Sequence, residues 1–119
     1  MDTIKLGRFG EKEAAKYLRK KGYHITAMNY SCRMGEIDII AENAEFIAFV
    51  EVKLRKNASF AEAREFVTRS KQKKIIMTAQ LWLSSHECFK QPRFDVIEIY
   101  APDGERGALT INHIKNAFM

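Results

Sequence analysis

Several residue types that often mark a function are scarce in this chain of 119 residues. It has two cysteines, Cys32 and Cys88, and their spacing matches no metal-binding motif. A disulfide between them is conceivable, but free thiols in a reducing cytoplasm fit the sequence better, and we expect a cytoplasmic protein. The three histidines follow no pattern, and no arrangement of His, Cys and Ser indicates a nucleophilic catalyst.

Long apolar runs are also missing. No stretch approaches the ~20 apolar residues that a membrane helix needs, and the start of the chain lacks the apolar segment of a signal peptide. With two prolines and six glycines, the chain contains no linker, repeat or low-complexity segment. We therefore expect residues 1–119 to form a single domain that has no membrane partner.

What the chain does have is enough apolar sequence for a core and an excess of positive charge. It is 46% hydrophobic and 29% charged, which favours a folded protein over a disordered one. Its net charge is +5 and its isoelectric point is near 9.3. Such a balance favours an anionic partner, nucleic acid first, although many basic proteins bind no particular anion.

The hydrophobic pattern predicts an α/β protein in which helices flank a mixed central sheet. Gly22 is expected to cap the first helix, and Thr68 or Ser70 to begin the second long one. Ser59 and Glu62 have the spacing of a capping box, which suggests a further short helix. In chain order we expect a helix (3–21), three strands (24–30, 36–41, 46–53), the short helix (60–67), a helix (70–85) and two strands (93–100, 109–114).

The second and third strands are expected to form an antiparallel hairpin that carries acidic residues in apolar runs. With a period of two, Glu36, Asp38 and Ile40 share one face, and Glu51 shares a face with Lys53. Burying an unpaired carboxylate is costly, so a hard cation such as Mg²⁺ between Asp38 and Glu51 would explain them. The alternative is a solvated face with a cross-strand ion pair.

The two long helices offer further candidate residues. Glu11 falls in the middle of an apolar face with Ala14, Ala15 and Leu18. It is either a third acidic group that faces the hairpin or an anchor that pairs with a buried lysine or caps nearby backbone. In the other helix, Ile75, Ile76, Ala79, Trp82 and Leu83 form a core stripe.

Basic residues near that second helix are candidate phosphate ligands. Helix N-terminal turns suit phosphates, although lysines there are as often a solvated face. The candidates are Lys71, Gln72 and Lys74, together with Arg55 and Lys56 in a polar loop over 54–59. Asp95, in the strand over 93–100, is either a fourth acidic neighbour of the site or a solvated strand residue.

A set of short motifs extends along nearly the whole chain: Gly10-Glu11, Gly22-Tyr23, Asn29, Gly35-Glu36-Ile37-Asp38, Phe49-Val50-Glu51-Val52-Lys53, Val67-Thr68-Arg69-Ser70-Lys71-Gln72 and Arg93-Phe94-Asp95-Val96. These motifs resemble the YraN family of small bacterial proteins, which belongs to the PD-(D/E)xK nuclease superfamily. That superfamily also contains restriction endonucleases and archaeal Holliday-junction resolvases. The resemblance implies a restriction-endonuclease-like fold with the order αβββαββ.

The resemblance also implies roles for individual residues. Asp38 and Glu51 would be ligands of Mg²⁺ or Mn²⁺, and Glu36 an additional acidic residue. Lys53 would orient or activate water or stabilise the phosphate in the transition state, and Glu11 would be a helix acid near the metal. The proline that usually precedes the first acidic residue is replaced by Ile37.

We therefore expect metal-dependent hydrolysis of phosphodiester bonds in nucleic acid, DNA rather than RNA, with structured or branched DNA favoured. A homodimer is compatible with the sequence. Two alternatives come from other classes: a nucleic-acid-binding module of the same fold that does not cleave, and a protein-interaction scaffold in which the acidic cluster is structural.

Overall fold

The computed structural model describes residues 3–55 and 67–118, and its secondary structure follows the expected order αβββαββ. The bounds of the helices and strands agree with the expected ones to within two residues. The short helix expected over 60–67 falls almost wholly outside the described residues. The elements are α1 (Thr3–Lys20), β1 (His24–Cys32), β2 (Gly35–Glu42), β3 (Phe46–Arg55), α2 (Arg69–Ser84), β4 (Gln91–Tyr100), the 3-10 helix η2 (Gly104–Arg106) and β5 (Thr110–Ile114).

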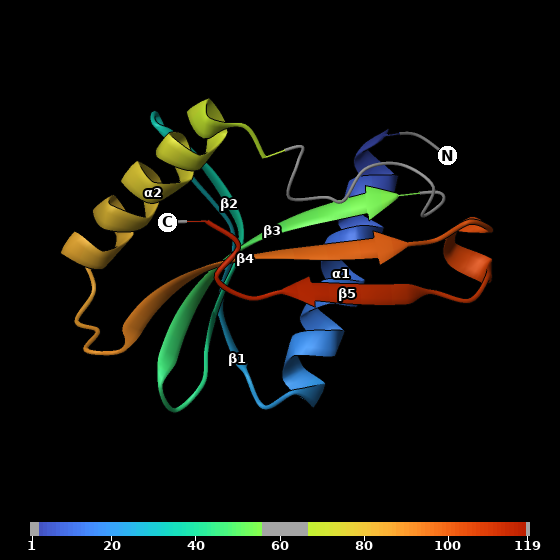
Figure 1. The fold of residues 1–119 in the computed structure, drawn as a ribbon, viewed down its shortest axis with the longest axis horizontal. Coiled ribbons are helices and arrows are strands. Elements are labelled where there is room, and N and C mark those ends of the chain that lie inside the picture. Colours follow the sequence, from blue (N-terminus) through green and yellow to red (C-terminus); the bar gives the residue numbers. More distant parts are fainter. Residues whose placement is uncertain (1–2, 56–66, 119) are drawn as a thin grey trace.

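The five strands form one mixed sheet with the order β1-β2-β3-β4-β5. Neighbouring strands are antiparallel except β3 and β4, which are parallel. Parallel neighbours need a long crossover connection, and α2 lies in it. Figure 1 shows α2 on one side of the sheet and α1 on the opposite side, which confirms the expected mixed sheet flanked by helices.

Helix α1 packs on the sheet through a small apolar face. Ala14 and Leu18 are fully buried and belong to a cluster with strand residues such as Ile39 and Val50. The helix ends as expected at Gly22, whose φ of +92° is easy for glycine alone. The amide of the next residue then donates to the carbonyl of Leu18 at 3.0 Å, which satisfies a helix-end carbonyl.

Helix α2 covers the other face. It begins after Thr68, whose hydroxyl accepts a hydrogen bond from the amide of Lys71 at 3.1 Å, so the expected N-cap is confirmed. The expected core stripe is confirmed at Ile75 and Trp82, and Trp82 packs edge-on against Phe49 of β3. No helix in the described part of the chain is long and apolar enough to cross a membrane.

Strands β2 and β3 separate part of the way along their length. Their pairing runs from Glu42↔Ile47 to Ile39↔Val50 and ends there. Beyond that point β2 continues beside β1, whereas β3 continues beside β4 (Figure 1). The next residue on each strand is an acidic one, Asp38 on β2 and Glu51 on β3, so both lie where the two strands fork.

The fork also breaks the expected alternation in β2. Ile37 and Ile40 both enter the core cluster beneath α2, while Ile39 between them faces α1. A strict period of two would separate Ile37 from Ile40, so Ile37 is the exception. Glu36 and Asp38 line a pocket with Ile75 of α2, and Ile40 packs beneath the same helix, in agreement with the common face expected for Glu36, Asp38 and Ile40. The exception falls where the pairing of β2 with β3 stops.

Candidate functional site

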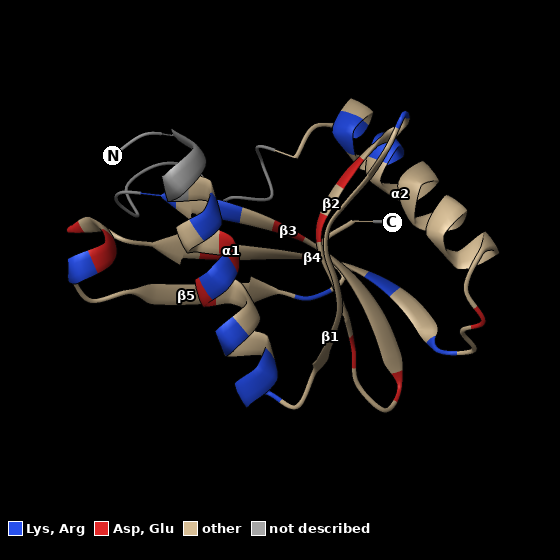
Figure 2. Ribbon diagram, turned by 180° about the vertical axis from the view of Figure 1, so that it is seen from behind, with Lys and Arg blue, Asp and Glu red and all other residues tan. Residues whose placement is uncertain are grey.

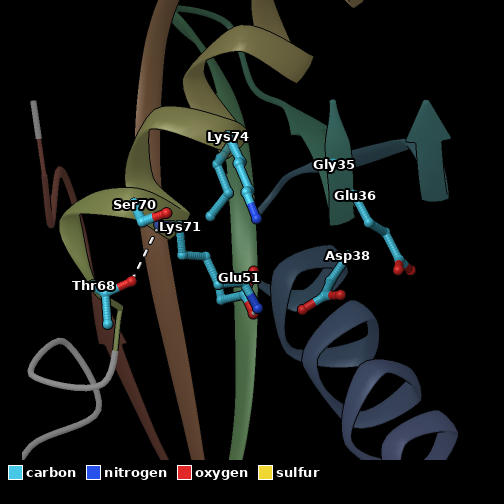
Figure 3. A pocket seen from close by; sticks show the side chains of 9 residues that line it. Gly35, Glu36, Asp38, Glu51, Thr68, Ser70, Lys71 and Lys74 are labelled. Carbon is cyan, nitrogen blue, oxygen red and sulfur yellow. Dashed lines mark hydrogen bonds and ion pairs between the residues drawn. The ribbon is translucent and has the colours of Figure 1, made fainter. Parts of the chain in front are cut away.

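A pocket of about 390 Å³ lies where the fork between β2 and β3 meets the first turns of α2. Figure 3 shows Asp38 on β2 with its carboxylate turned toward Glu51 on β3, while Lys71 reaches the same place from α2. The lining residues are Gly35, Glu36, Asp38, Glu51, Thr68, Ser70, Lys71, Lys74 and Ile75. The structure thus brings together residues from three elements that the sequence analysis selected separately.

Glycine lets α2 lie close to β2 at one edge of this pocket. A Cβ atom on Gly35 would lie 3.1 Å from the hydroxyl of Thr78 and 3.3 Å from Cβ of Lys74. Both distances are tighter than ordinary van der Waals contact, so a side chain here would push α2 away from β2. Gly35 therefore keeps the wall of the pocket closed at the start of β2.

Glu51 is held by two ammonium groups. It is 6% exposed, and its Oε1 lies 2.9 Å from Nζ of Lys71 and 3.6 Å from Nζ of Lys53. Burial opposes the charge on Lys71, but the hydrogen bond to Glu51 and the nearby carboxylate charges together outweigh it and raise the pKa of Lys71. The ion pair therefore favours the charged form of Lys71.

Asp38 is in a different situation. Its Oδ2 accepts a hydrogen bond from the backbone amide of Val52 at 2.8 Å. Burial, and next the negative charge of Glu51, raise the pKa of Asp38 from 3.8 to about 7, and Glu11 and Glu36 act in the same direction. The lysines of the site therefore do not compensate the negative charge that Asp38 carries when it is ionised.

Glu11 reaches this region from α1. Its carboxylate accepts a hydrogen bond from the side chain of Asn29, a residue of β1 with a φ of +53°. Burial raises the pKa of Glu11, and the charges of Glu36 and Glu51 raise it further. Glu11 thus lies close enough to interact electrostatically with the site. The interpretation of Glu11 as a third acidic group that faces the hairpin requires this.

The donor set fits a hard divalent cation held by two carboxylates. Within residues 3–55 and 67–118, no group of three or more His, Cys, Asp and Glu side chains is close enough to hold one ion together. Mg²⁺ is often bound through one or two carboxylates, with water and substrate phosphates as its remaining ligands. Asp38 and Glu51 offer such a pair, and the raised pKa of Asp38 marks a place where added positive charge is favourable.

Only some of the other candidate residues line the pocket. Glu36 and Lys74 line the pocket. Gln72 does not, because its Nε2 donates to the carbonyl of Val67 at 2.9 Å and so stays at the start of α2. Arg55 was expected in a loop, but it ends β3, and its Nε and Nη2 atoms are buried. Lys56 lies outside the described residues.

Sequence reasoning missed a second buried polar network, on the α1 side of the sheet. Asp95 is fully buried, so the expectation of a solvated strand residue was wrong. Its carboxylate lies 2.9 Å from Nε of Arg93 and 2.7 Å from Nε2 of His113, and it accepts from the amide of Asn116 at 3.0 Å. Tyr17 on α1 contacts the other ring nitrogen of His113 at 3.1 Å.

The charge state of Asp95 follows from these contacts. Burial alone would raise its pKa, but the hydrogen bonds from His113 and Arg93 lower it instead. Arg93 and Asp95 are two residues apart in an apolar strand, and that spacing was a usable signal for an ion pair on one strand face. The contribution of His113 depends on the pairing of β4 with β5, which no local pattern indicates.

Comparison with known proteins finds relatives that match nearly the whole of this chain. Residues 10–99 match the uncharacterised protein family UPF0102. A UPF0102 protein of Caldanaerobacter subterraneus is 47% identical over 115 residues, which cover 95% of this chain and 93% of that protein. One from Clostridioides difficile is 44% identical over 119 residues (99% and 100%), and one from Nocardia farcinica is 42% identical over 118 residues (98% and 91%). These names state no activity.

Proposed function

The chain belongs to the uncharacterised protein family UPF0102, as its resemblance to the YraN proteins led us to expect, and we propose that it is a metal-dependent nuclease. Its substrate would be a phosphodiester bond of DNA or RNA, with structured or branched DNA favoured. What supports this function above all is the meeting of Asp38 and Glu51 at the strand fork, inside a pocket bordered by lysines. Two carboxylates that face each other favour a cation between them, and the lysines favour a polyanion beside that cation.

Asp38 and Glu51 are the residues that would hold Mg²⁺ or Mn²⁺. When bound, such an ion supplies positive charge that polarises the scissile phosphate and a neighbouring water. Glu36 and Glu11 are near enough to raise the pKa of Asp38, so they add to the negative potential that attracts the ion. Neither is close enough to complete a three-residue cluster with the pair.

The lysines of the site would act on the phosphate. Lys53 lies beside Glu51 on the same strand face, where its ammonium group can stabilise negative charge that develops on the phosphate oxygens. Lys71 and Lys74 lie on the α2 side of the pocket and would contact the phosphate backbone. Contacts of this kind fix the position of a strand without reading its sequence.

One observation favours a second candidate, a nucleic-acid-binding module that does not cleave. The ammonium group of Lys71 already lies 2.9 Å from Glu51 and neutralises it without a metal. If this pair persists in the presence of divalent ions, the site binds phosphate but has no catalytic metal. Metal affinity therefore separates the two candidates.

The test is a cleavage screen with purified protein over single-stranded, duplex, flap and four-way DNA and structured RNA, in Mg²⁺ and in Mn²⁺. We expect cleavage of at least one substrate, with Asp38→Asn and Glu51→Gln each abolishing it. Glu42→Gln is the matched control, because Glu42 lies at the far end of β2 and pairs with Lys90 at 3.1 Å. Activity that survives in both site variants refutes the proposed function.

Calorimetry with Mn²⁺ tests the metal site independently of a substrate. Binding should be present in the wild-type protein and in Glu42→Gln, and absent in Asp38→Asn and in Glu51→Gln. Unchanged binding in both site variants removes the metal site. Nucleic-acid binding without metal binding would favour the non-cleaving module, and the absence of both would favour a protein-interaction scaffold.

A further inference from the structure

Three cationic side chains form a straight stripe along α1. Arg8, Lys12 and Arg19 are spaced i, i+4 and i+11, and a helical step of about 100° puts them within about 40° of one another around the axis. Their side chains are exposed, while Ala15, on the same line, is buried. Figure 2 shows the basic residues in blue along α1. The stripe spans about 16 Å at the rise of an α-helix.

The stripe borders a hollow of about 330 Å³ between α1 and β1. Met28 and Asn29 of β1 form its opposite wall, and Met28 is 39% exposed. Among residues 3–55 and 67–118, no carboxylate forms an ion pair with any cation of the stripe. Arg8 interacts electrostatically with Glu11, and the exposed charges of Lys12 and Arg19 are available to an anion from solution.

Glu11 links the hollow electrostatically with the site at the strand fork. Glu11 is a lining residue of the hollow, and its carboxylate interacts electrostatically with Glu36 and Glu51. Lys71 and Lys74 lie on the α2 side of the same acidic site. Positive charge therefore flanks Asp38 and Glu51 from two helices, α1 and α2.

The opposite side of the stripe is less suitable for an anion. There Arg8 and Lys12 border another hollow of about 370 Å³, which also contains Glu13 and Glu105. Those two carboxylates would repel a phosphate. In the hollow toward β1, the acidic lining residue is Glu11, which interacts electrostatically with Glu36 and Glu51 of the proposed metal site.

We propose that the hollow between α1 and β1 binds one nucleic-acid strand through its phosphates and leads that strand to Asp38 and Glu51. A single line of cations over about 16 Å suits the successive phosphates of one strand, whereas a duplex presents two backbones. Exposed Met28 gives a sugar or an unstacked base an apolar contact. The inference deepens the proposed nuclease function, on which it rests, by naming a substrate with a single-stranded segment.

The test compares two triple variants that lose the same charge. Arg8→Gln, Lys12→Gln and Arg19→Gln remove the stripe. Lys16→Gln, Lys20→Gln and Lys115→Gln remove three exposed lysines that do not line this hollow. Binding is measured by fluorescence anisotropy in EDTA, with a single-stranded DNA, a duplex that carries a single-stranded tail, and a blunt duplex. Circular dichroism verifies that both variants fold.

We expect the stripe variant to bind the single strand and the tailed duplex at least tenfold more weakly, and the blunt duplex much less affected. The salt slope for the single strand should fall by about 2, since each lost phosphate contact removes about 0.7. The control variant should change affinity less than threefold. Equal losses in the two variants, an equal loss for the blunt duplex, or a wild-type protein that binds no single strand would overturn the inference.

Cleavage of the tailed duplex in Mg²⁺ distinguishes this inference from the function on which it rests. A wild-type protein that binds the tail through the stripe but never cleaves refutes the nuclease and leaves the strand path intact. A wild-type protein that cleaves, with an unchanged KM in the stripe variant, refutes the strand path and leaves the nuclease intact.

Discussion

The substitution Asp38→Asn should make the metal-free protein more stable at alkaline pH, although it removes a residue of the proposed active site. Burial and the charge of Glu51 raise the pKa of Asp38 from 3.8 to about 7. A carboxyl whose pKa is higher in the folded than in the unfolded state binds more protons when folded. Its unfavourable effect is therefore absent below pH 3.8, grows as the pH rises toward 7, and is complete above that.

The size of the effect follows from the pKa difference. At about 1.4 kcal/mol for each pH unit between 3.8 and 7, the ionised carboxylate lowers the free energy of unfolding by roughly 4 kcal/mol above pH 7. Asparagine avoids this loss but weakens the hydrogen bond from the amide of Val52, at a cost of about 1–2 kcal/mol. We expect Asp38→Asn to exceed the wild type by about 2–3 kcal/mol at pH 8.

Urea unfolding in EDTA between pH 4 and pH 8, followed by the fluorescence of Trp82, measures this difference. The free-energy difference between the variant and the wild type should rise by about 3–4 kcal/mol over that range. Asp103→Asn, which removes the same charge from an exposed turn, is the control and should give a nearly flat difference. A flat difference for Asp38→Asn as well would refute the electrostatic reasoning about the site.

Divalent metal gives the complementary result. Mn²⁺ at a hundred times its dissociation constant should stabilise the wild-type protein by about 2.7 kcal/mol. It should leave Asp38→Asn unchanged, because one of the two ligands is lost. Equal stabilisation of both proteins would mean that the ion binds elsewhere.

Three further substitutions test other residues. Lys71→Ala should weaken nucleic-acid binding about equally for all sequences and lower the salt slope by about one unit, whereas a sequence-dependent loss would mean that Lys71 reads bases. Glu11→Gln should fold normally but lose Mn²⁺ affinity or cleavage, as measured by calorimetry and the cleavage screen; if it retains both, Glu11 is structural. Asp95→Asn should lower the free energy of unfolding by about 3–5 kcal/mol at pH 7 in urea, because it leaves Arg93 buried without its counter-charge, while Mn²⁺ affinity per folded molecule stays the same.

The local elements of this fold could be predicted because their signals are local. The start of α2 is marked by the hydroxyl of Thr68 and the end of α1 by Gly22, and both act within a few residues of themselves. Trp82 lies on a stripe with helical spacing and is buried as that spacing indicates. The hairpin of β2 and β3 could also be predicted, since a short polar loop joins two apolar runs.

The shape of the site could not be predicted in the same way. The pairing of Ile39 with Val50 is the last one between β2 and β3. Nothing in the sequence near either residue indicates that the pairing ends there. Beyond that pairing β3 continues beside β4, which follows it across a crossover of more than 30 residues. Arg55 illustrates the same limit: a polar, basic stretch suggested a loop, but pairing with Tyr100 extends β3 to that residue.

The missed network at Asp95 depends even more on distant contacts. His113 reaches Asp95 because β5 pairs with β4, and Tyr17, 96 residues earlier in the chain, reaches His113 because α1 crosses that face. A single histidine in an edge strand gives no indication of either contact. Only the assembled sheet makes it part of a buried cluster.

Asp38 and Asp95 lie in the same sheet, and they differ as we expect a proposed metal ligand to differ from a structural carboxylate. Asp95 accepts hydrogen bonds from Arg93, His113 and the amide of Asn116, and these lower its pKa despite complete burial. Asp38 accepts from one backbone amide and faces Glu51, and its pKa is raised. Burial is common to both, so the supply of donors and the sign of the neighbouring charge decide the direction.

That contrast also predicts where an added cation changes the protein. At Asp95 the positive charge is already provided by the chain, so an external ion would have to displace Arg93 and would gain little. At Asp38 a bound ion would supply positive charge that the fold does not provide, and its binding would lower the pKa of that carboxyl and release a proton near neutral pH. Proton release on addition of Mn²⁺ at pH 6.5, measured in a weakly buffered solution, should therefore occur in the wild-type protein and disappear in Asp38→Asn. Release that persists in the variant would show that another group binds the ion.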